Sequence, residues 1–229
     1  MIPLRDDNPI TIRPIVTFVL IGLCVAVFLW QLSLGPSLGQ AAVYALGLTP
    51  AVLFGSAELP AQLVWAPPPL TVFTSMFLHG GLLHLGGNML YLWIFADNVE
   101  DCMGHGRFVV FYALCGVAAA LAQALPYPDS TVPMIGASGA VSGVLGAYVL
   151  LYPRAHVLVA VPLLVILYTL RLPAVFVLGM WFVGQLLSSL AAPSAGGGVA
   201  FRAHVGGFLA GLLLIKLFRT RRGPVRPFR

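Results

Sequence analysis

Charge is scarce in this sequence of 229 residues: Asp, Glu, Lys and Arg together make up 8% of it, against roughly 25% in soluble globular proteins. Hydrophobic residues make up 59%, against roughly 45–50%. So few charged side chains do not solvate a globule of this size, which excludes a soluble enzyme and a disordered tail. The same argument excludes a nucleic-acid binder, despite the net charge of +5. The composition indicates a multi-pass integral membrane protein.

Cysteine is also scarce, and metal-binding patterns are missing. The three cysteines, Cys24, Cys102 and Cys115, have no paired spacing and form no CxxC, so the sequence predicts neither a disulfide framework nor a zinc knuckle. The sequence contains no HExxH motif, and no predicted helix carries two histidines on one face. We therefore expect no metal and no cofactor.

Long apolar runs are what this chain has in place of charge. A membrane-spanning helix needs about 20 mostly apolar residues, with a range of roughly 17–25. The apolar run Val157–Leu170 is too short for its length to show whether it spans the membrane. It is bracketed by arginines and contains Pro162. The sequence predicts six spans, at about residues 15–32, 78–96, 108–125, 138–152, 172–192 and 203–218.

The distribution of Lys and Arg sets the orientation, because these residues accumulate on the cytoplasmic side of membranes. If the N-terminus is cytoplasmic and Val157–Leu170 does not cross, Arg202 is the only one of the 12 basic residues on the outer side. If Val157–Leu170 crossed, the basic tail would change sides and this bias would collapse. We therefore predict an all-α polytopic membrane protein, a six-transmembrane-helix bundle with cytoplasmic N- and C-termini. Residues 1–229 form a single membrane domain, of which 219–229 are a basic cytoplasmic tail.

Two apolar segments lie outside the predicted spans. Val157–Leu170 is interpreted as a re-entrant or interfacial segment, or as an extension of a neighbouring helix. The first outer loop, about residues 33–77, is long, and Glu58 is its single charge. A floppy extracellular loop would be more polar, so we expect this loop to lie in the bilayer interface.

Intramembrane polar residues gather at one predicted depth. No acidic or basic residue lies deep in a span, which argues against an ion-coupled transporter or a channel. Polar groups in the spans must face protein or a water-filled cavity. Spans two, four and six all run inward, so their first halves lie near the outer face, and they carry His84 with Asn88, Ser138, and His204. The other polar residues in spans are His79, Ser142 and Gln185.

Small residues predict close packing of the fourth and sixth spans. Residues 136–146 are almost all small on one side of the fourth span, and Gly207 and Gly211 form a GxxxG motif in the sixth. Such spacing allows the backbones of membrane helices to approach closely. His204, Gly207 and Gly211 are at i, i+3 and i+7, so the face that packs is the face that carries the histidine.

Ser138 and His204 are the candidate reactive pair. A serine beside a histidine is an activated nucleophile, because the imidazole accepts the hydroxyl proton. Gly136 and Gly139 leave room for a substrate backbone to reach the serine. No acid is available to orient His204, so the pair would be a dyad. Taken singly, a membrane serine, a lone histidine and a GxxxG motif are as well explained by helix packing; their conjunction favours chemistry.

The second span supplies candidate hydrogen-bond donors. His84 and Asn88 are four residues apart and share a helix face, whereas His79 is turned by about 140° from His84. The backbone N–H of Ser138 lies at a helix start, where it lacks an intrahelical partner. These three donors are expected to stabilise an oxyanion that develops next to Ser138.

These motifs, taken together, resemble the rhomboid family of intramembrane serine proteases over nearly the whole chain. The resemblance implies that Ser138 is the nucleophile, that His204 is the general base and that His84 and Asn88 are oxyanion donors. It also implies that the substrates are membrane-anchored proteins, cut in or near their transmembrane segments. The matching pieces are His84-x-x-x-Asn88, Gly136-Ala137-Ser138-Gly139, Ala203-His204-x-x-Gly207-x-x-x-Gly211 and Glu100-x-x-x-Gly104-x-x-Arg107-Phe108.

Two positions depart from the family pattern. The Trp-Arg pair usual in the first outer loop is absent, since Trp65 is followed by Ala66. The position four after the nucleophile, aromatic in some members and able to stack on the histidine, is Ser142. Neither change removes a predicted catalytic group, but they leave open how the loop meets the lipid and how His204 is held.

Three other functions are compatible with parts of this sequence. A catalytically silent rhomboid-like protein would bind transmembrane helices without cutting them. A metal or haem protein would use His79, His84 and His204, and a channel or transporter would need intramembrane charge. The partners expected are the lipid bilayer and membrane-anchored proteins, in the plasma (inner) membrane if the source is bacterial. The sequence does not determine the oligomeric state.

Overall fold

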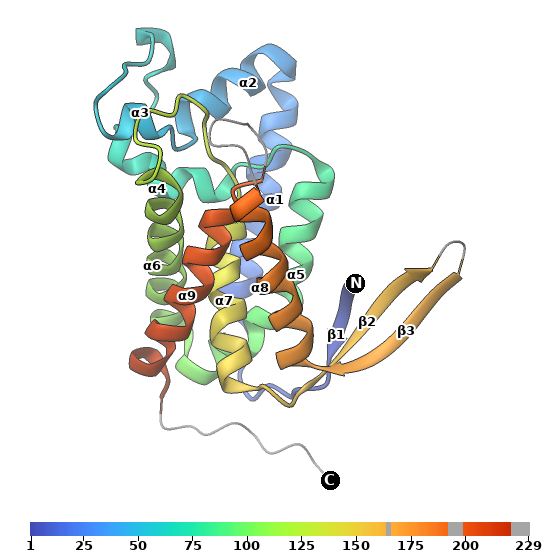
Figure 1. The fold of residues 1–229 in the computed structure, drawn as a ribbon. Coiled ribbons are helices and arrows are strands. Elements are labelled where there is room, and N and C mark those ends of the chain that lie inside the picture. The colour runs from blue at the N-terminus through green and yellow to red at the C-terminus, as the bar shows by residue number, and fades with distance from the viewer. Residues whose placement is uncertain (164–165, 192–198, 221–229) are drawn as a thin grey trace.

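The computed structural model describes residues 1–163, 166–191 and 199–220. It is a bundle of roughly parallel helices, with short helices of one long loop at one end and a small sheet beginning at the other (Figure 1). Within the described residues, each of the six predicted spans is occupied by one helix. These helices are α1 (Ile15–Ser33), α5 (Leu82–Met103), α6 (His105–Ala124), α7 (Ser138–Leu151), α8 (Ala174–Ala191) and α9 (Phe201–Phe218).

Four of these helices, α1, α6, α8 and α9, are long and apolar enough to cross a membrane. Helix α7 is apolar but has only 14 residues, and α5 carries Asp97, Glu100 and Asp101 near its end. Large apolar side chains on the outer surface, such as Phe18, Val109 and Leu213, are exposed, as expected of a protein surrounded by lipid. The chain is therefore a multi-pass membrane protein.

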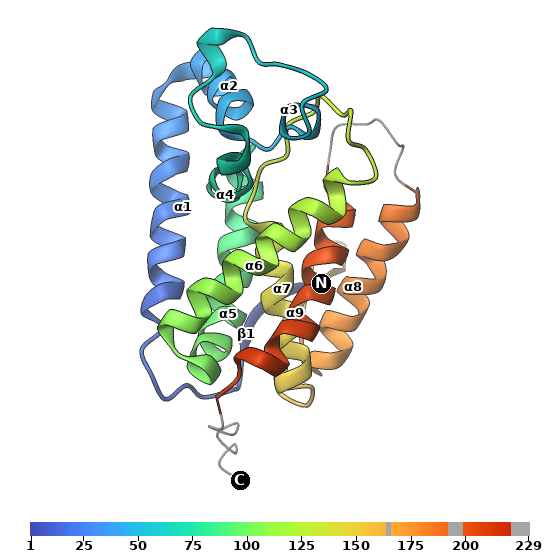
Figure 2. The ribbon, with the colours of Figure 1, turned by 90° about the vertical axis from the view of Figure 1, so that its left-hand side faces the viewer.

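Helix α7 lies in the middle of the bundle, with α1 and α8 on opposite sides (Figure 2). Every α7 residue from Gly139 to Tyr148 is buried, and the helix contacts α5, α6, α8 and α9. A helix that is enclosed by protein does not need to match the full thickness of the bilayer. Its first residue, Ser138, is thereby placed inside the bundle.

Glycines allow α7 and α9 to touch backbone to backbone. A Cβ atom added at Gly211 would lie 1.9 Å from the carbonyl oxygen of Gly143, and one at Gly207 would lie 2.0 Å from that of Gly139. No real side chain occupies such a position without moving a helix. The GxxxG motif of the sixth span is thus the contact surface of α9 with α7.

We expect Gly211→Ala to destabilise the bundle, because the new methyl group meets backbone rather than a flexible side chain. Overpacking costs about 1–3 kcal/mol in a well-packed core, and rigid surroundings place this site at the upper end of that range. Thermal melts in detergent should show a clearly lower Tm. Gly184→Ala on α8 is the matched control, since no atom lies within 4 Å of its added Cβ. Equal melting temperatures of the two variants would contradict this account.

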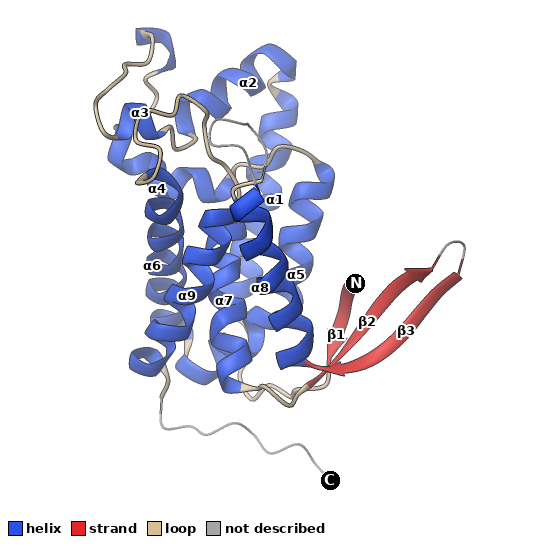
Figure 3. Ribbon diagram, viewed as in Figure 1, coloured by secondary structure: helices blue, strands red, loops and turns tan. Residues whose placement is uncertain are grey.

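A three-stranded antiparallel sheet is present, in the order β1–β2–β3, where all-α structure was predicted (Figure 3). The strands are β1 (Ile2–Asp6), β2 (His156–Leu163) and β3 (Ile166–Pro173). The all-helical prediction is wrong for these residues, and Val157–Leu170 is not a helical extension. The physical reason is pairing: β2 bonds to β3 along its length, and β1 pairs with residues 157–160. Pro162 lies beyond the residues of β2 that pair with β1, so β3 is the one strand beside it.

The first loop is folded rather than extended. It contains the short helices α2 (Gly35–Leu46), α3 (Pro50–Leu53) and α4 (Thr71–Thr74) and the 3-10 turns Ala61–Leu63, Pro68–Leu70 and Ser75–Phe77. The second span was predicted to begin at residue 78, but α5 begins at Leu82. His79 therefore precedes the helix, and its predicted place on a second face of that helix is wrong.

Buried acids at the end of α5 hold the start of α1. Glu100 accepts hydrogen bonds from the backbone N–H groups of Val16 and Thr17, at 2.9 and 2.8 Å, and from the Thr17 hydroxyl at 2.7 Å. Asp101 accepts from the backbone of Thr11 and Ile12. Unpaired N–H groups at a helix start are costly when buried, so these carboxylates fix α1 against α5.

Candidate active site

The entry into α7 depends on Gly136. Its φ of +119° is a conformation that only glycine adopts easily, and its N–H donates to the carbonyl oxygen of Ser75 at 2.8 Å. A Cβ atom there would lie 2.6 Å from Nε2 of His84 and 3.8 Å from Nδ2 of Asn88. The chain therefore turns into Ser138 directly under these two side chains.

Ser138 and His204 meet between α7 and α9. Nε2 of His204 lies 2.8 Å from Oγ of Ser138, within hydrogen-bond distance, and the histidine is buried. Both residues are in the first turn of their helices, and the glycine contacts described above hold those helices together. The distance is the one required between a nucleophile and its base.

His84 and Asn88 point toward the same place from α5. Nδ1 of His84 accepts a hydrogen bond from the N–H of Gly80 at 3.3 Å, so its Nε2 carries the ring proton and faces Gly136. Nδ2 of Asn88 is buried and has no hydrogen-bond partner among the described residues. A buried donor without an acceptor is unusual and suits a site that receives one from a substrate.

His79 lies behind His84 rather than on the far side of a helix. Their ring centroids are 5.2 Å apart, and the ring of His79 is buried beside the carbonyl oxygen of Phe77. The backbone of His79 exchanges hydrogen bonds with the side chain of Gln31 on α1. Within residues 1–163, 166–191 and 199–220, no three His, Cys, Asp or Glu side chains group so as to hold a metal ion.

Gly139 is used for packing. A Cβ atom there would lie 2.6 Å from Cβ of Ala119 on α6, so its missing side chain lets α6 approach α7. The predicted role of Gly139 in substrate approach has no support in this arrangement. The space left by Gly136, in contrast, adjoins His84 and Asn88.

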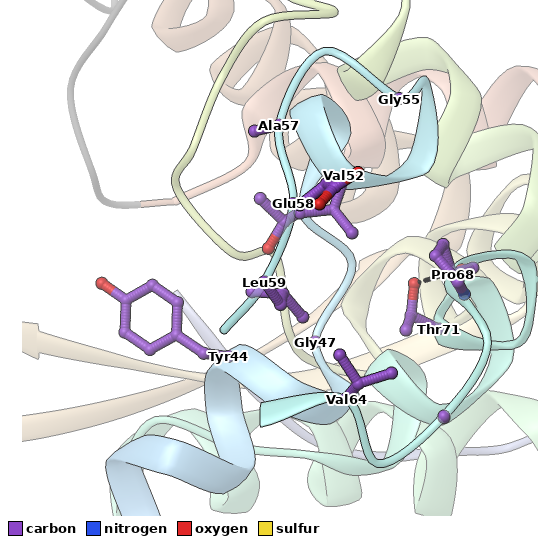
Figure 4. A pocket seen from close by; sticks show the side chains of 12 residues that line it. Tyr44, Gly47, Val52, Gly55, Ala57, Glu58, Leu59, Val64, Pro68 and Thr71 are labelled. Carbon is purple, nitrogen blue, oxygen red and sulfur yellow. Dashed lines mark hydrogen bonds between the residues drawn. The ribbon is translucent and has the colours of Figure 1, made fainter. Parts of the chain in front are cut away.

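A cavity of about 790 Å³ opens onto Ser138, so water and an extended peptide segment have room to enter the bundle. The cavity is lined by residues of the helices α5, α6, α7, α8 and α9 and of the segment that precedes α7. Its polar members include His84, Asn88, Ser138, Gln185 and His204, and its apolar ones include Ile135 and Trp181. A smaller pocket of about 280 Å³ lies in the first loop, among Tyr44, Glu58 and Thr71 (Figure 4). It contains none of the predicted site residues.

Two residues of α8 complete the surroundings of His204. Oε1 of Gln185 lies 2.6 Å from Nδ1 of His204, and the ring centroid of Trp181 lies 5.9 Å from that of the histidine. Sequence reasoning marked Gln185 only as a polar residue in a span. The available signal was its depth, since Gln185 is in the outer half of a span that the sequence predicts to run outward. Ser142 donates to the carbonyl oxygen of Ser138, so its hydroxyl is engaged within α7.

Comparison with known proteins decides the family. Residues 66–221 match the model of the Rhomboid domain. The chain belongs to the rhomboid family. It is 32% identical over 193 residues to Rhomboid protein 1, mitochondrial, of Saccharomyces cerevisiae, covering 75% of this chain and 51% of that protein. It is 39% identical over 100 residues to the rhomboid protease GluP of Bacillus subtilis, covering 42% of this chain and 18% of that protein.

Rhomboids of both kinds, proteases and inactive proteins, are among the relatives. The chain is 30% identical over 103 residues to Inactive rhomboid protein 1 of Drosophila melanogaster, covering 45% of this chain and 7% of that protein. This rhomboid spans about half or less of the length of these three relatives. Family membership alone therefore leaves activity to be argued from the site.

Proposed function

We propose that this rhomboid is an intramembrane serine endopeptidase that cuts membrane-anchored proteins in or near their transmembrane segments. The observation that carries the proposal is the 2.8 Å contact of His204 with Ser138 at a cavity inside an apolar bundle. A helix-packing serine has no need of an imidazole partner or of space for water. Relatives that are named proteases support the same function.

In the proposed reaction, Oγ of Ser138 attacks the carbonyl carbon of the scissile peptide while Nε2 of His204 takes the hydroxyl proton. The negative oxygen of the tetrahedral intermediate receives hydrogen bonds from the N–H of Ser138 and from the side chains of His84 and Asn88. His204 then gives its proton to the leaving amine. Water entering through the cavity releases the acyl group by the reverse sequence of proton transfers.

The protein is proposed to cross the membrane six times with both termini in the cytoplasm, in the plasma (inner) membrane if the source is bacterial. Support comes from the common position of the site residues: Ser138, His204 and the His84–Asn88 pair are all in the half of their helices nearest the first loop. This end of the bundle is the outer end in the proposed orientation. Substrates would reach the dyad from that side.

Cysteine labelling tests this topology. Asp129 precedes α7 and Arg154 follows it, and both are exposed, so cysteines introduced there should react with impermeant reagents from opposite sides of the membrane. The three native cysteines are buried and give a low background. Labelling of both positions from one side would contradict a crossing by α7 and the shared depth of the site.

The rival is a silent rhomboid that binds transmembrane helices without cutting them. Reconstitution in liposomes with a single-span model substrate separates the two functions. We expect cleavage by the wild-type protein and none by Ser138→Ala. A folded wild-type protein that binds the substrate but leaves it intact, and that does not react with a fluorophosphonate, would favour the silent alternative.

A further inference from the structure

Helix α8 presents two side chains to the imidazole of His204. Trp181 and Gln185 are four residues apart, so they share a helix face. The Trp181 ring is tilted by 33° to the imidazole plane, and Oε1 of Gln185 is 2.6 Å from Nδ1 of His204. Because α8 carries neither the serine nor the histidine, these contacts link a separate helix to the reactive pair.

The Gln185 contact selects one tautomer of His204. An amide oxygen only accepts hydrogen bonds, so the nitrogen facing it, Nδ1, must carry the ring proton. A neutral imidazole has one N–H, which leaves the lone pair on Nε2, the nitrogen 2.8 Å from Oγ of Ser138. This is the only tautomer in which His204 accepts the hydroxyl proton.

The opposite tautomer would be unproductive. With the proton on Nε2, the imidazole would donate to Oγ of Ser138 and could not remove its proton. Among the described residues, Gln185 is the only hydrogen-bond partner of Nδ1. The hydroxyl of Ser142 forms its hydrogen bond elsewhere, since it donates to the carbonyl oxygen of Ser138 at 2.6 Å. In the described part of the chain, one group fixes the ring proton, and it lies on α8.

We propose that Gln185 is a positioning residue, which holds His204 in the Nδ1–H tautomer and in the plane that points Nε2 at Ser138. This inference rests on the function proposed above. The proton balance closes: Nε2 gains the hydroxyl proton during attack and gives it to the leaving amine, while Nδ1–H stays bonded to Gln185 throughout. A neutral amide does this without adding a negative charge to the membrane interior, which would be costly.

Kinetics in liposomes test the proposal. Gln185→Leu removes the acceptor, so kcat should fall by about 10- to 100-fold, part of the roughly 10²–10⁴-fold that a positioned base supplies, with KM unchanged. Gln185→Glu should keep a clearly higher rate than Gln185→Leu, because a carboxyl group accepts the same hydrogen bond through its carbonyl oxygen even when burial keeps it neutral. Met180→Leu is the matched control on the same helix, at a side chain that is 50% exposed, and should keep wild-type kinetics.

The tautomer itself is measured by ¹⁵N NMR of the full chain labelled at histidine, with His204 assigned by the loss of its signals in His204→Gln. We expect a protonated Nδ1 in the wild type and in Gln185→Glu, and a shift toward protonated Nε2 in Gln185→Leu. An unprotonated Nδ1 in the wild type, an unchanged tautomer in Gln185→Leu, or a Gln185→Leu loss confined to KM would overturn the proposal. If the wild type cut no substrate, the proposed function would fail while NMR still decided the role of Gln185.

Discussion

Ser138→Ala should abolish proteolysis while the protein stays folded. The variant loses only the hydroxyl oxygen that lies 2.8 Å from Nε2 of His204, and alanine is well tolerated at the first residue of a helix. Loss of a catalytic serine costs on the order of 10⁶-fold in kcat in the best-studied serine protease series. Cleavage of a single-span substrate in liposomes should therefore fall below detection, with Tm within a few degrees of wild type.

Ser142→Ala is the matched control for this result. Ser142 is one turn further along α7, is buried, and donates to the carbonyl oxygen of Ser138 instead of bonding to His204. It should keep activity. A fluorophosphonate should label wild type and Ser142→Ala but not Ser138→Ala. Labelling that persists in Ser138→Ala and disappears in Ser142→Ala would place the nucleophile one turn away from where we propose it.

His84→Ala and Asn88→Ala should each lower turnover by about 10²–10³-fold, the usual cost of removing one oxyanion donor. The reason is geometric: both side chains reach the space beside Gly136, and the buried Nδ2 of Asn88 has no acceptor among the described residues until substrate supplies one. The Ser138–His204 contact is untouched by either change. Single-turnover rates at saturating substrate in liposomes would report the loss directly.

Leu82→Ala is the control for both donors, since Leu82 lies two residues before His84, its side chain is 73% exposed and it does not line the cavity. It should cut at the wild-type rate. His79→Ala is a less clean comparison than the sequence indicated, because the ring of His79 packs against that of His84, with ring centroids 5.2 Å apart. Well-folded His84→Ala and Asn88→Ala proteins with near wild-type rates would leave backbone N–H groups as the oxyanion donors.

The sequence by itself determined the parts of this rhomboid that are decided locally. In the hydrocarbon core of a membrane, the backbone must form its hydrogen bonds within its own helix, and the side chains must be mostly apolar. Hydropathy therefore located each long helix, most of them to within about four residues. The GxxxG spacing likewise marked the face of α9 that meets α7, because helical periodicity places Gly207 and Gly211 in one row. The juxtaposition of Ser138 and His204 followed from span direction combined with that packing.

Only the tertiary structure decided the features that depend on partners distant in sequence. Residues 156–163 and 166–173 form strands because they pair with each other and, for 157–160, with β1, and an apolar run taken alone does not show such pairing. Gln185 reaches His204 only because α8 is rotated with that face toward α9, and hydropathy does not fix rotation. His79 turned out to precede α5, because the first loop folds back before the helix begins. The pairing of strands and the rotation of a helix about its axis depend on contacts between residues distant in sequence, so only the tertiary structure determines them.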